Sequence, residues 1–362
     1  MKTIVTVLGA RPQFIKAAVL SRIIRQRGEF KEVIVHTGQH FDDNMSDIFF
    51  RELGIPPATY NLDVNKVGHG AMTGKMMERL EPVLEKESPD LVVVYGDTNS
   101  TLAGALVARK MGIPVAHIEA GLRSGNMKMP EEINRILTDR ISNMLFCPTD
   151  QAMKNLENEG FEAFDTCIVH SGDIMKDSVA FFKDGMGSFQ DLSVRYGLQG
   201  EKFALATIHR QENTDDASKL SSIFKGLDLI SAKLPVVMPL HPRTRAAMQS
   251  YDIESEIVLI DPVGYAAMQQ LLHFCEVVIT DSGGLQKEAF FHEKPCLVVR
   301  PQTEWVELIE SGLAQLVPAD AQQLVASFEQ IPSVLPNFDL NLFGIDPGET
   351  IYGEIKRFLV SA

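Results

Sequence analysis

Short apolar runs alternate along this chain with longer segments in which apolar residues recur every three or four positions. The first run, Ile4 to Leu8, is broken at Gly9, and the segment from Gln13 onward has the apolar spacing of a helix. The same order of strand, polar turn and helix then recurs. Because crossover helices between parallel strands produce this alternation, the pattern predicts an α/β fold built from βαβ units.

Strands are predicted in both halves of the chain, and most of them end in a polar or charged turn. They cover residues 4–8, 32–36, 91–95, 113–118, the MLFC and TCIVH segments, 203–207, 235–240, 257–260, 277–280 and 296–299. Helices are predicted over residues 42–53, 71–86 and 350–359, and residues 54–70 are expected to be irregular. Residues 176–200 have no sheet pattern, so the domain boundary is placed there.

Two doubly wound, Rossmann-like domains follow from this division. Residues 1–175 form the first and residues 176–349 the second, and the last helix, about 350–362, can pack back on the first. The length of 362 residues suits two domains, and 45% hydrophobic with 23% charged residues are values of a globular chain.

Charge and targeting signals exclude several classes. The net charge of −14 does not indicate nucleic-acid binding, although local Arg, His and helix N-termini can still bind an anion. The chain begins in a strand without a signal-peptide pattern, and no apolar run approaches the ~20 residues that span a bilayer. We therefore expect a cytoplasmic protein with neither a nucleic acid nor a membrane as partner.

Metal and thiol chemistry are not indicated either. The cysteines are widely spaced and are expected to be buried free thiols: Cys147, Cys167, Cys275 and Cys296. His36 and His40 flank a glycine-containing turn, and there is no HExxH or paired Cys/His set, so no metal is expected. No GxSxG or Cys/His nucleophile signature is present.

Three carboxylates lie where the chain reverses. Asp97 and Glu119 each follow a predicted strand, and Glu131 begins a predicted helix. The carboxyl ends of parallel strands face the ligand crevice, so three acids there indicate proton transfer. The alternative for Glu131 and its neighbour Glu132 is simple complementation of the helix dipole.

The motif DSGGLQKEA indicates a phosphate site in the second half. Ser282, Gly283 and Gly284 open a helix after a strand, with backbone N–H groups free and no Cβ in the way of a phosphate. Glu288, one turn later, could accept hydrogen bonds from a ribose diol. The alternative is an N-cap serine with a tight turn. Because the motif is neither GxGxxG nor a Walker loop, a dinucleotide cofactor is not expected.

Cations also follow strands in both halves: Arg11, Lys16, His209, Arg210 and His241. In the second half, one phosphate-binding cluster would account for all of them. In the first half, Arg11 and Lys16 could share a site with an anion, and the alternative is that both are solvated basic residues.

These motifs, in this order, closely resemble those of the non-hydrolysing UDP-N-acetylglucosamine 2-epimerases. The matches are GARPQFIK, TGQH, YGDTNSTLAGAL, HIEAGLRS, PEEINR, HRQEN, LHPRTR and DSGGLQKEA, along essentially the whole chain. The resemblance implies two facing domains of the glycosyltransferase-B architecture, an active site in the cleft between them, a homodimer and no cofactor. It implies the conversion of UDP-GlcNAc to UDP-ManNAc for bacterial surface polysaccharide such as O-antigen.

The implied reaction removes the C2 proton, eliminates UDP to give a 2-acetamidoglucal, and adds UDP again after protonation on the other face. By motif match, the acid/base candidates are Asp97, Glu119 and Glu131, and His209 would assist departure of UDP. Arg11, Lys16 and Arg135 are implied to contact phosphate in the substrate or to order the carboxylates. The residues implied in holding UDP are Ser282, Gly283, Gly284 and Glu288, with Arg210 and His241 nearby. Gln39 and His40 match a possible activator site for a second UDP-sugar.

Some positions depart from the pattern of many members. GTRPEAIK is GARPQFIK here, Lys287 replaces an acid, and PQTEWVEL stands where a TTERPE-like run is common. These departures resemble the branch that acts on UDP-2,3-diacetamido-2,3-dideoxyglucuronic acid, whose C5 carboxylate could meet Lys287 or Lys128. That substrate is the alternative. A hydrolysing epimerase, a retaining glycosyltransferase and a UDP-sugar sensor are the other classes considered.

Overall fold

The computed structural model describes residues 1–39, 52–183, 187–198, 202–331, 338 and 340–361. The chain forms two compact units, Met1–Ser178 with Asn341–Ala362, and Val179–Leu340. The chain leaves the first unit after Ser178, close to the boundary expected after residue 175. It returns at Asn341 and ends in helix α16 (Pro347–Ser361), which packs on α1 (Arg11–Arg27).

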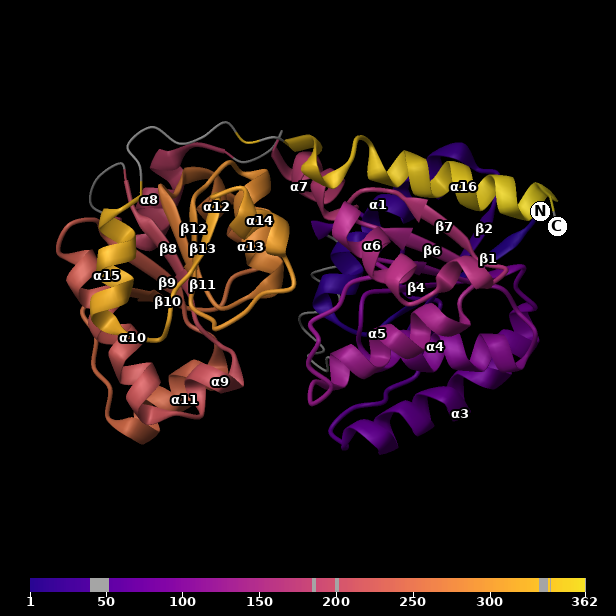
Figure 1. The fold of residues 1–362 in the computed structure, drawn as a ribbon, viewed down its shortest axis with the longest axis horizontal. Helices are drawn as coiled ribbons and strands as arrows, with labels where there is room; N and C mark the ends of the chain where they lie inside the picture. Colours follow the sequence, from indigo (N-terminus) through magenta and orange to yellow (C-terminus); the bar gives the residue numbers. More distant parts are fainter. Residues whose placement is uncertain (40–51, 184–186, 199–201, 332–337, 339, 362) are drawn as a thin grey trace. The chain divides into compact units, whose positions relative to one another are not determined.

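Unit 1 contains a parallel sheet of seven strands within the described residues, in the order β3-β2-β1-β4-β5-β6-β7 (Figure 1). The strands are β1 (Thr3–Leu8), β2 (Lys31–His36), β3 (Tyr60–Asn61), β4 (Leu91–Tyr95), β5 (Val115–Ile118), β6 (Met144–Cys147) and β7 (Cys167–His170). The other helices are α3 (His69–Glu87), α4 (Asn99–Lys110), α5 (Pro130–Ile141), α6 (Asp150–Asn158), α7 (Met175–Lys183) and the 3-10 turn η1 (Phe161–Ala163).

Helices cover both faces of this sheet, so its central strands are apolar along their whole length. Val5, Val7, Val92 and Val94 share a buried core with α3 and α4. A Cβ on Gly104 of α4 would lie 3.1 Å from Val94 Cγ1, so the glycine allows α4 to approach the sheet closely.

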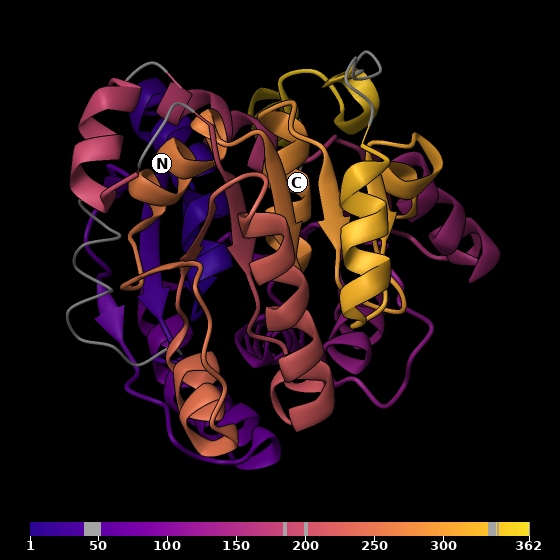
Figure 2. The ribbon, with the colours of Figure 1, turned by 90° about the vertical axis from the view of Figure 1, so that its left-hand side faces the viewer.

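Unit 2 repeats the design with six described strands in the order β10-β9-β8-β11-β12-β13. They are β8 (Ala204–Thr207), β9 (Val236–Pro239), β10 (Val258–Ile260), β11 (Val277–Thr280), β12 (Cys296–Val298) and β13 (Ala314–Leu316). Its helices are α8 (Phe189–Tyr196), α9 (Gln211–Thr214), α10 (Ala217–Ser231), α11 (Pro242–Tyr251), α12 (Tyr265–Phe274), α13 (Gly283–Phe291), α14 (Val306–Glu310) and α15 (Ala321–Glu329), with η2 (Leu340–Phe343) at the return to unit 1. Figure 2 shows α10 and α15 side by side, where a Cβ on Gly226 would lie 3.0 Å from Leu324 Cδ2.

Strand order reverses at one place in each sheet. In unit 1 the chain leaves β1 toward β2 and β3 and then resumes on the other side with β4, and in unit 2 the same reversal separates β8 from β11. Open parallel sheets bind ligands at the carboxyl ends of the strands beside such a reversal. The turns after β1, β4, β8 and β11 are therefore the first places to look for a site.

Three details differ from the sequence predictions. Segment 54–70 holds the short strand β3, and β13 was not predicted. Cys167 is exposed, whereas the other three cysteines are buried free thiols. The predicted helix over 42–53 lies mostly outside the described residues. Among the helices that the structure describes, none has both the length and the apolar character to cross a bilayer.

Candidate functional site

The β1 and β4 turns of unit 1 are tied together by Gln13. Its Oε1 accepts hydrogen bonds from the backbone N–H groups of Gly9 and Ala10, at 2.8 and 3.0 Å. Its Nε2 donates to the Tyr95 carbonyl at 2.8 Å. A glutamate, which many members of the resembled family have here, could not make that donation when ionised. The departure from GTRPEAIK thus has a structural role in joining the two turns.

Glu119 and Lys16 form a buried ion pair beside these turns. Their side chains are 10% and 7% exposed, and Lys16 Nζ contacts Glu119 Oε2. Glu119 directly follows β5 and has a φ of 71°, in the left-handed region that non-glycine residues rarely occupy. Such strained positions concentrate at functional sites. Glu119 thus lies at the carboxyl end of β5, where Lys16 compensates its charge.

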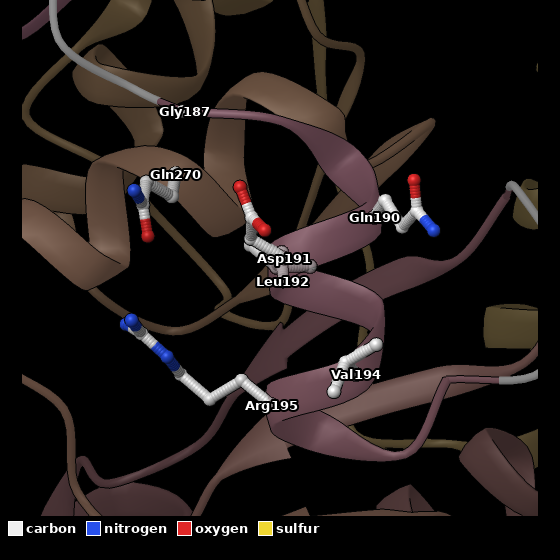
Figure 3. A pocket seen from close by; sticks show the side chains of 7 residues that line it. All are labelled: Gly187, Gln190, Asp191, Leu192, Val194, Arg195 and Gln270. Carbon is white, nitrogen blue, oxygen red and sulfur yellow. The ribbon is translucent and has the colours of Figure 1, made fainter.

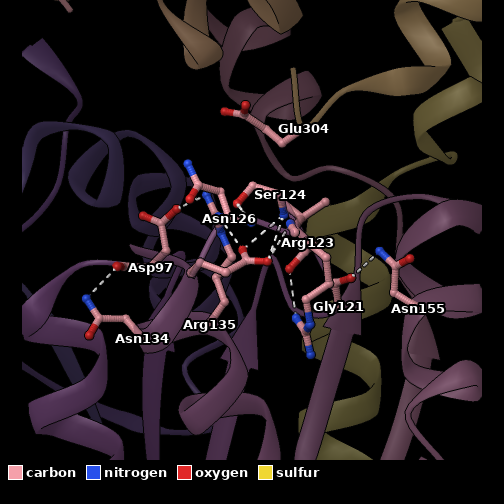
Figure 4. Close-up of polar contacts among 12 residues, drawn as sticks. Asp97, Gly121, Arg123, Ser124, Asn126, Asn134, Arg135, Asn155 and Glu304 are labelled. Atoms are coloured by element: carbon pink, nitrogen blue, oxygen red, sulfur yellow. Dashed lines mark hydrogen bonds and ion pairs between the residues drawn. The ribbon is translucent and has the colours of Figure 1, made fainter. Parts of the chain in front are cut away.

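Asp97 is bound to Arg135 on the adjoining helix α5 (Figure 4). Arg135 Nη2 lies 2.5 Å from Asp97 Oδ2, and its Nη1 lies 2.9 Å from Glu132 Oε2. Asn134 Nδ2 also donates to the Asp97 carbonyl, at 2.9 Å. The Asp97 side chain remains 31% exposed, whereas Arg135 is buried. The carboxylate is therefore oriented and still accessible.

The pKa of Asp97 is shifted by burial and by four charged neighbours. Burial raises the pKa of Asp97 above its ordinary value, although Arg135 lowers it. Glu119 and Glu131 raise it further through like-charge repulsion. A carboxyl whose pKa is raised in this way, chiefly by burial, is a reasonable acid/base group. Glu131 lies in the first turn of α5, and both Glu119 and Glu131 are close enough to Asp97 to affect its pKa.

Glu131 and Glu132 have different surroundings. Glu132 is buried and accepts hydrogen bonds from the Ser124 and Gly125 N–H groups as well as from Arg135. Glu131 is only partly buried. Glu132 therefore has a structural role at the start of α5, as considered for this pair. Glu131 stays a candidate acid/base residue.

In unit 2, Asp281 organises the turn after β8. Its buried carboxylate accepts hydrogen bonds from the backbone N–H groups of His209 and Arg210, at 3.0 and 2.9 Å, and from Asn213 Nδ2 at 3.0 Å. His209 Nδ1 lies 3.5 Å from the same carboxylate, and its ring is 36% exposed. Asp281 thus orients His209, whose ring remains partly exposed.

His241 caps helix α11, since its Nδ1 accepts a hydrogen bond from the Arg243 N–H at 3.2 Å. Burial lowers the pKa of His241, and the nearby His209 and Arg243 act in the same direction. The two histidine ring centroids are 5.4 Å apart. His241 therefore serves as a neutral N-cap beside His209. From the sequence, this capping role could not be distinguished from a contact with phosphate.

The N-terminus of α13 carries the predicted phosphate turn. Ser282 is the N-cap, and Gly283 and Gly284 are the first helical residues. A Cβ on Gly283 would lie 2.3 Å from Glu304 Oε1, and Glu304 is held by Arg300 at 2.9 Å. Gly284 has open space where its Cβ would be. Backbone N–H groups at a helix N-terminus bind phosphate readily, and this turn leaves room for one.

Glu288, one turn further along α13, is held by a buried chain of amide and imidazole groups. Gln269 Nε2 donates to Glu288 Oε2 at 2.9 Å, and Gln269 Oε1 lies 2.8 Å from His292 Nε2. Because an amide oxygen only accepts, His292 Nε2 carries the proton. Burial lowers the pKa of His292 to about 3, with nearby cations acting in the same direction, so the ring is neutral. The sequence pointed to Glu288 and missed its two supports.

Two departures from the family pattern contact one another. Lys287 is 1% exposed, and its Nζ lies 4.0 Å from the centroid of the Trp305 ring. A cation over an indole face is stabilised by the ring quadrupole. Lys287 is thus packed in the interior of unit 2, which argues against the contact with a sugar carboxylate considered above. Lys128 is exposed.

Two other predicted positions can be placed only in part. Gln39 Oε1 accepts hydrogen bonds from Ser100 N and Oγ, at 3.1 and 2.8 Å, which ties it to the start of α4. His40 lies outside the described residues, so the activator site stays a prediction. Arg11 is the first residue of α1 and is partly buried.

Unit 2 contains cavities both at the strand ends and away from them. One of about 630 Å³ follows β9 and β10, lined among others by Leu240, Ile260, Val263 and Gly264. Another of about 490 Å³ lies between α8 and α12 and contains no predicted site residue (Figure 3). The first is at the strand ends and the second is not. Among the described residues, no group of three His, Cys, Asp or Glu side chains is placed to hold a metal.

Comparison with known proteins identifies the family. A sequence model of the UDP-N-acetylglucosamine 2-epimerase family matches residues 22–353. This chain belongs to that family. The predicted resemblance is confirmed, and the protein is an epimerase of nucleotide sugars.

Relatives within the family differ in the sugar that they act on. The UDP-2,3-diacetamido-2,3-dideoxy-D-glucuronate 2-epimerase of Pseudomonas aeruginosa is 55% identical over 90% of this chain and 90% of its own. The UDP-N-acetylglucosamine 2-epimerase of Methanocaldococcus jannaschii is 39% identical over 89% and 90%.

A crystal structure of the Methanocaldococcus jannaschii epimerase in complex with UDP-GlcNAc and UDP matches with a TM-score of 0.89 and 37% identity. The match covers 99% of this chain and 100% of that one. The predicted α/β class, with two Rossmann-like sheets of the glycosyltransferase-B type, is confirmed.

Proposed function

We propose that this epimerase inverts C2 of a UDP-2-acetamido sugar by eliminating and re-adding UDP. The observation that carries the proposal is the carboxylate group at the strand reversal of unit 1. There Glu119 is paired with buried Lys16, and Asp97 with buried Arg135. The C2 proton of a sugar is weakly acidic, so its removal needs a well-placed base and a stabilised leaving group.

The proposed step conserves atoms and charge. A carboxylate takes the C2 proton, the electron pair of that bond forms the C1–C2 double bond, and the C1–O bond breaks as UDP leaves. A protonated group then delivers a proton to the other face of C2, and UDP attacks C1 again. Because the two faces need separate groups, more than one of Asp97, Glu119 and Glu131 takes part. Asp97, whose pKa is raised by burial and like charges, is suited to carry a proton.

Unit 2 would hold the UDP. The open turn at Gly284 receives the diphosphate, and partly exposed His209 assists the departing phosphate. The uridine end fits the cavity after β10, which lies three strands from β11. At ~4.8 Å per strand this is about 14 Å, the length scale of a nucleoside diphosphate.

The support of Glu288 by Gln269 leads to a prediction about UDP affinity. Gln269→Leu removes a hydrogen bond to a charged group, worth about 1.5–3 kcal/mol, so we expect UDP to bind at least ~10-fold more weakly. Titration calorimetry with UDP measures this. Gln270→Leu, the adjacent substitution facing the α8–α12 cavity, is the matched control. Equal affinities for both variants would show that Gln269 does not orient the ribose-binding carboxylate.

The first candidate substrate is UDP-2,3-diacetamido-2,3-dideoxyglucuronate. It is favoured by 55% identity to the Pseudomonas epimerase over nearly the whole length of both chains. UDP-N-acetylglucosamine is the second candidate, favoured by the likeness to the Methanocaldococcus enzyme. The cation that would receive a C5 carboxylate is not Lys287, because that side chain is buried against Trp305.

Incubation of the purified protein with each UDP-sugar in D2O tests the proposal. We expect deuterium at C2 of both epimers, with the faster rate for the diacetamido glucuronate. Absence of label at C2 would contradict elimination. Free sugar with UDP would instead indicate a hydrolysing epimerase. Transfer of the sugar to an added acceptor, with no C2 inversion of the UDP-sugar alone, would indicate a glycosyltransferase, and binding without turnover would indicate a sensor.

A homodimer, a cytoplasmic location and a role in surface polysaccharide synthesis are further parts of the proposal. Light scattering of the purified protein would test the first of them.

A further inference from the structure

We propose that His117 is a positioning residue for this site, which fixes the Gly96–Asp97 turn by donating a hydrogen bond to the Gly96 carbonyl. The inference rests on the proposed function, since it concerns how Asp97 and Glu119 are held for C2 chemistry. His117 belongs to β5, and its side chain is completely buried.

Both ring nitrogens of His117 have partners. Nε2 lies 2.7 Å from the Gly96 carbonyl oxygen, and Nδ1 lies 2.6 Å from Asp139 Oδ1. A carbonyl oxygen only accepts, so Nε2 must carry a proton. Because both nitrogens are occupied inside unit 1, the ring is not available to exchange a proton with a substrate. It acts through the backbone instead.

Asp139 keeps the ring in place. It is 0% exposed, and its Oδ2 accepts hydrogen bonds from the Gly121 N–H at 3.1 Å and from Arg123 Nη1 at 2.7 Å. Arg123 also pairs with Glu159, 2.6 Å from Nε to Oε1. Burial alone would raise the pKa of Asp139, but His117 and Arg123 more than offset it and hold that pKa below its ordinary value. Asp139 is thus an ionised acceptor, and both of its carboxylate oxygens are hydrogen-bonded.

The bond to Gly96 matters because the backbone of this residue is unusual. Gly96 has a φ of 61°, in the left-handed region, and its N–H donates to the Ile118 carbonyl at 2.9 Å. The N–H and the carbonyl of Gly96 are thus both held by residues of β5, through the Ile118 carbonyl and the His117 ring. Asp97 follows Gly96 directly, and Glu119 lies two residues beyond His117.

One buried ring therefore spans both carboxylate-bearing turns. A misplacement of ~1 Å in a reacting group can cost about 10²-fold in rate. Loss of the Gly96 bond should consequently lower the rate of the chemical step. It should leave UDP affinity unchanged, because the diphosphate turn belongs to the other unit.

Two isosteric substitutions separate the two bonds. In His117→Gln the amide nitrogen can take the place of Nε2 and keep the donation to Gly96. In His117→Asn it takes the place of Nδ1 and keeps only the contact with Asp139. We expect His117→Asn to lower kcat for C2 labelling in D2O by about 10²-fold, with KM and UDP affinity within about threefold. His117→Gln should retain a rate within about 10-fold of the original protein.

Equal losses in the two variants, or losses that follow their melting temperatures, would overturn the proposal in favour of simple packing. A measurement on the unaltered protein holds even if neither variant folds. Nitrogen NMR of histidine-labelled protein should show His117 Nε2 protonated and hydrogen-bonded, and an unprotonated Nε2 would contradict the inference. Failure of the unaltered protein to label C2 would refute the proposed function instead, while the NMR result would still report on His117.

Discussion

Glu119→Gln is expected to lower turnover of the UDP-sugar by about 10²- to 10⁴-fold, the usual contribution of a positioned acid or base. Glutamine keeps the size of the side chain at this strained position but cannot take a proton. The measurement is the initial rate of C2 labelling in D2O at saturating substrate. UDP affinity should stay within about threefold, because the proposed diphosphate turn begins at Ser282 in unit 2.

Asp97→Asn and Glu131→Gln are expected to give losses of the same order for the same reason. Glu85→Gln, an exposed position on α3, is the matched control and should leave the rate unchanged. If the substitutions at the three acids weakened UDP binding and left the labelling rate of bound substrate intact, these residues would be structural. If only one of them mattered, proton transfer to the two faces of C2 would have to share a single group.

The positions of these acids could be predicted from the sequence because they depend on a local rule. Each of Asp97 and Glu119 follows an apolar run, and parallel strands present their carboxyl ends on one edge. The phosphate turn at Ser282 follows the same rule. The βαβ alternation also indicates that the strand order reverses in each sheet. It does not indicate which strands lie next to each other at the reversal.

The partners themselves depend on contacts between distant parts of the chain. Lys16 and Glu119 are separated by 103 residues, and Asp97 and Arg135 by 38. No periodicity encodes such a pairing. The left-handed backbone of Glu119 was also unforeseen, since nothing in HIEAGLRS distinguishes it from an extended residue.

Supporting residues were missed for a further reason. The role of such a side chain cannot be assigned until the residue that it contacts is known. Gln269 lies in an apolar helical pattern and reads as a surface amide until its contact with Glu288 is seen. Lys287 read as a solvated or ligand-binding cation, whereas it is buried over Trp305. Strands β3 and β13 were missed because two or three residues carry too little of a sheet pattern.

The Lys16–Glu119 pair gives the second large effect, on stability as well as activity. Lys16→Met leaves the Glu119 carboxylate buried without its cation, and breaking a buried pair costs about 3–5 kcal/mol. Lys31→Met is the matched control, because the Lys31 side chain is 50% exposed in its pair with Glu87. Exposed pairs contribute about 0–1 kcal/mol. Turnover should be lost in the first variant only.

The loss of stability must be measured in unit 1 itself. Tryptophan fluorescence would not report on it, because the single tryptophan, Trp305, belongs to unit 2. Amide hydrogen exchange of β4 and β5 reports the local free energy of opening directly. The double variant Lys16→Met with Glu119→Gln has no uncompensated buried carboxylate at position 119. It should therefore be more stable than Lys16→Met alone and yet remain inactive. Such a coupling is what two residues in direct contact show. A double variant as unstable as Lys16→Met would mean that the methionine disturbs packing and that the carboxylate is not the cause.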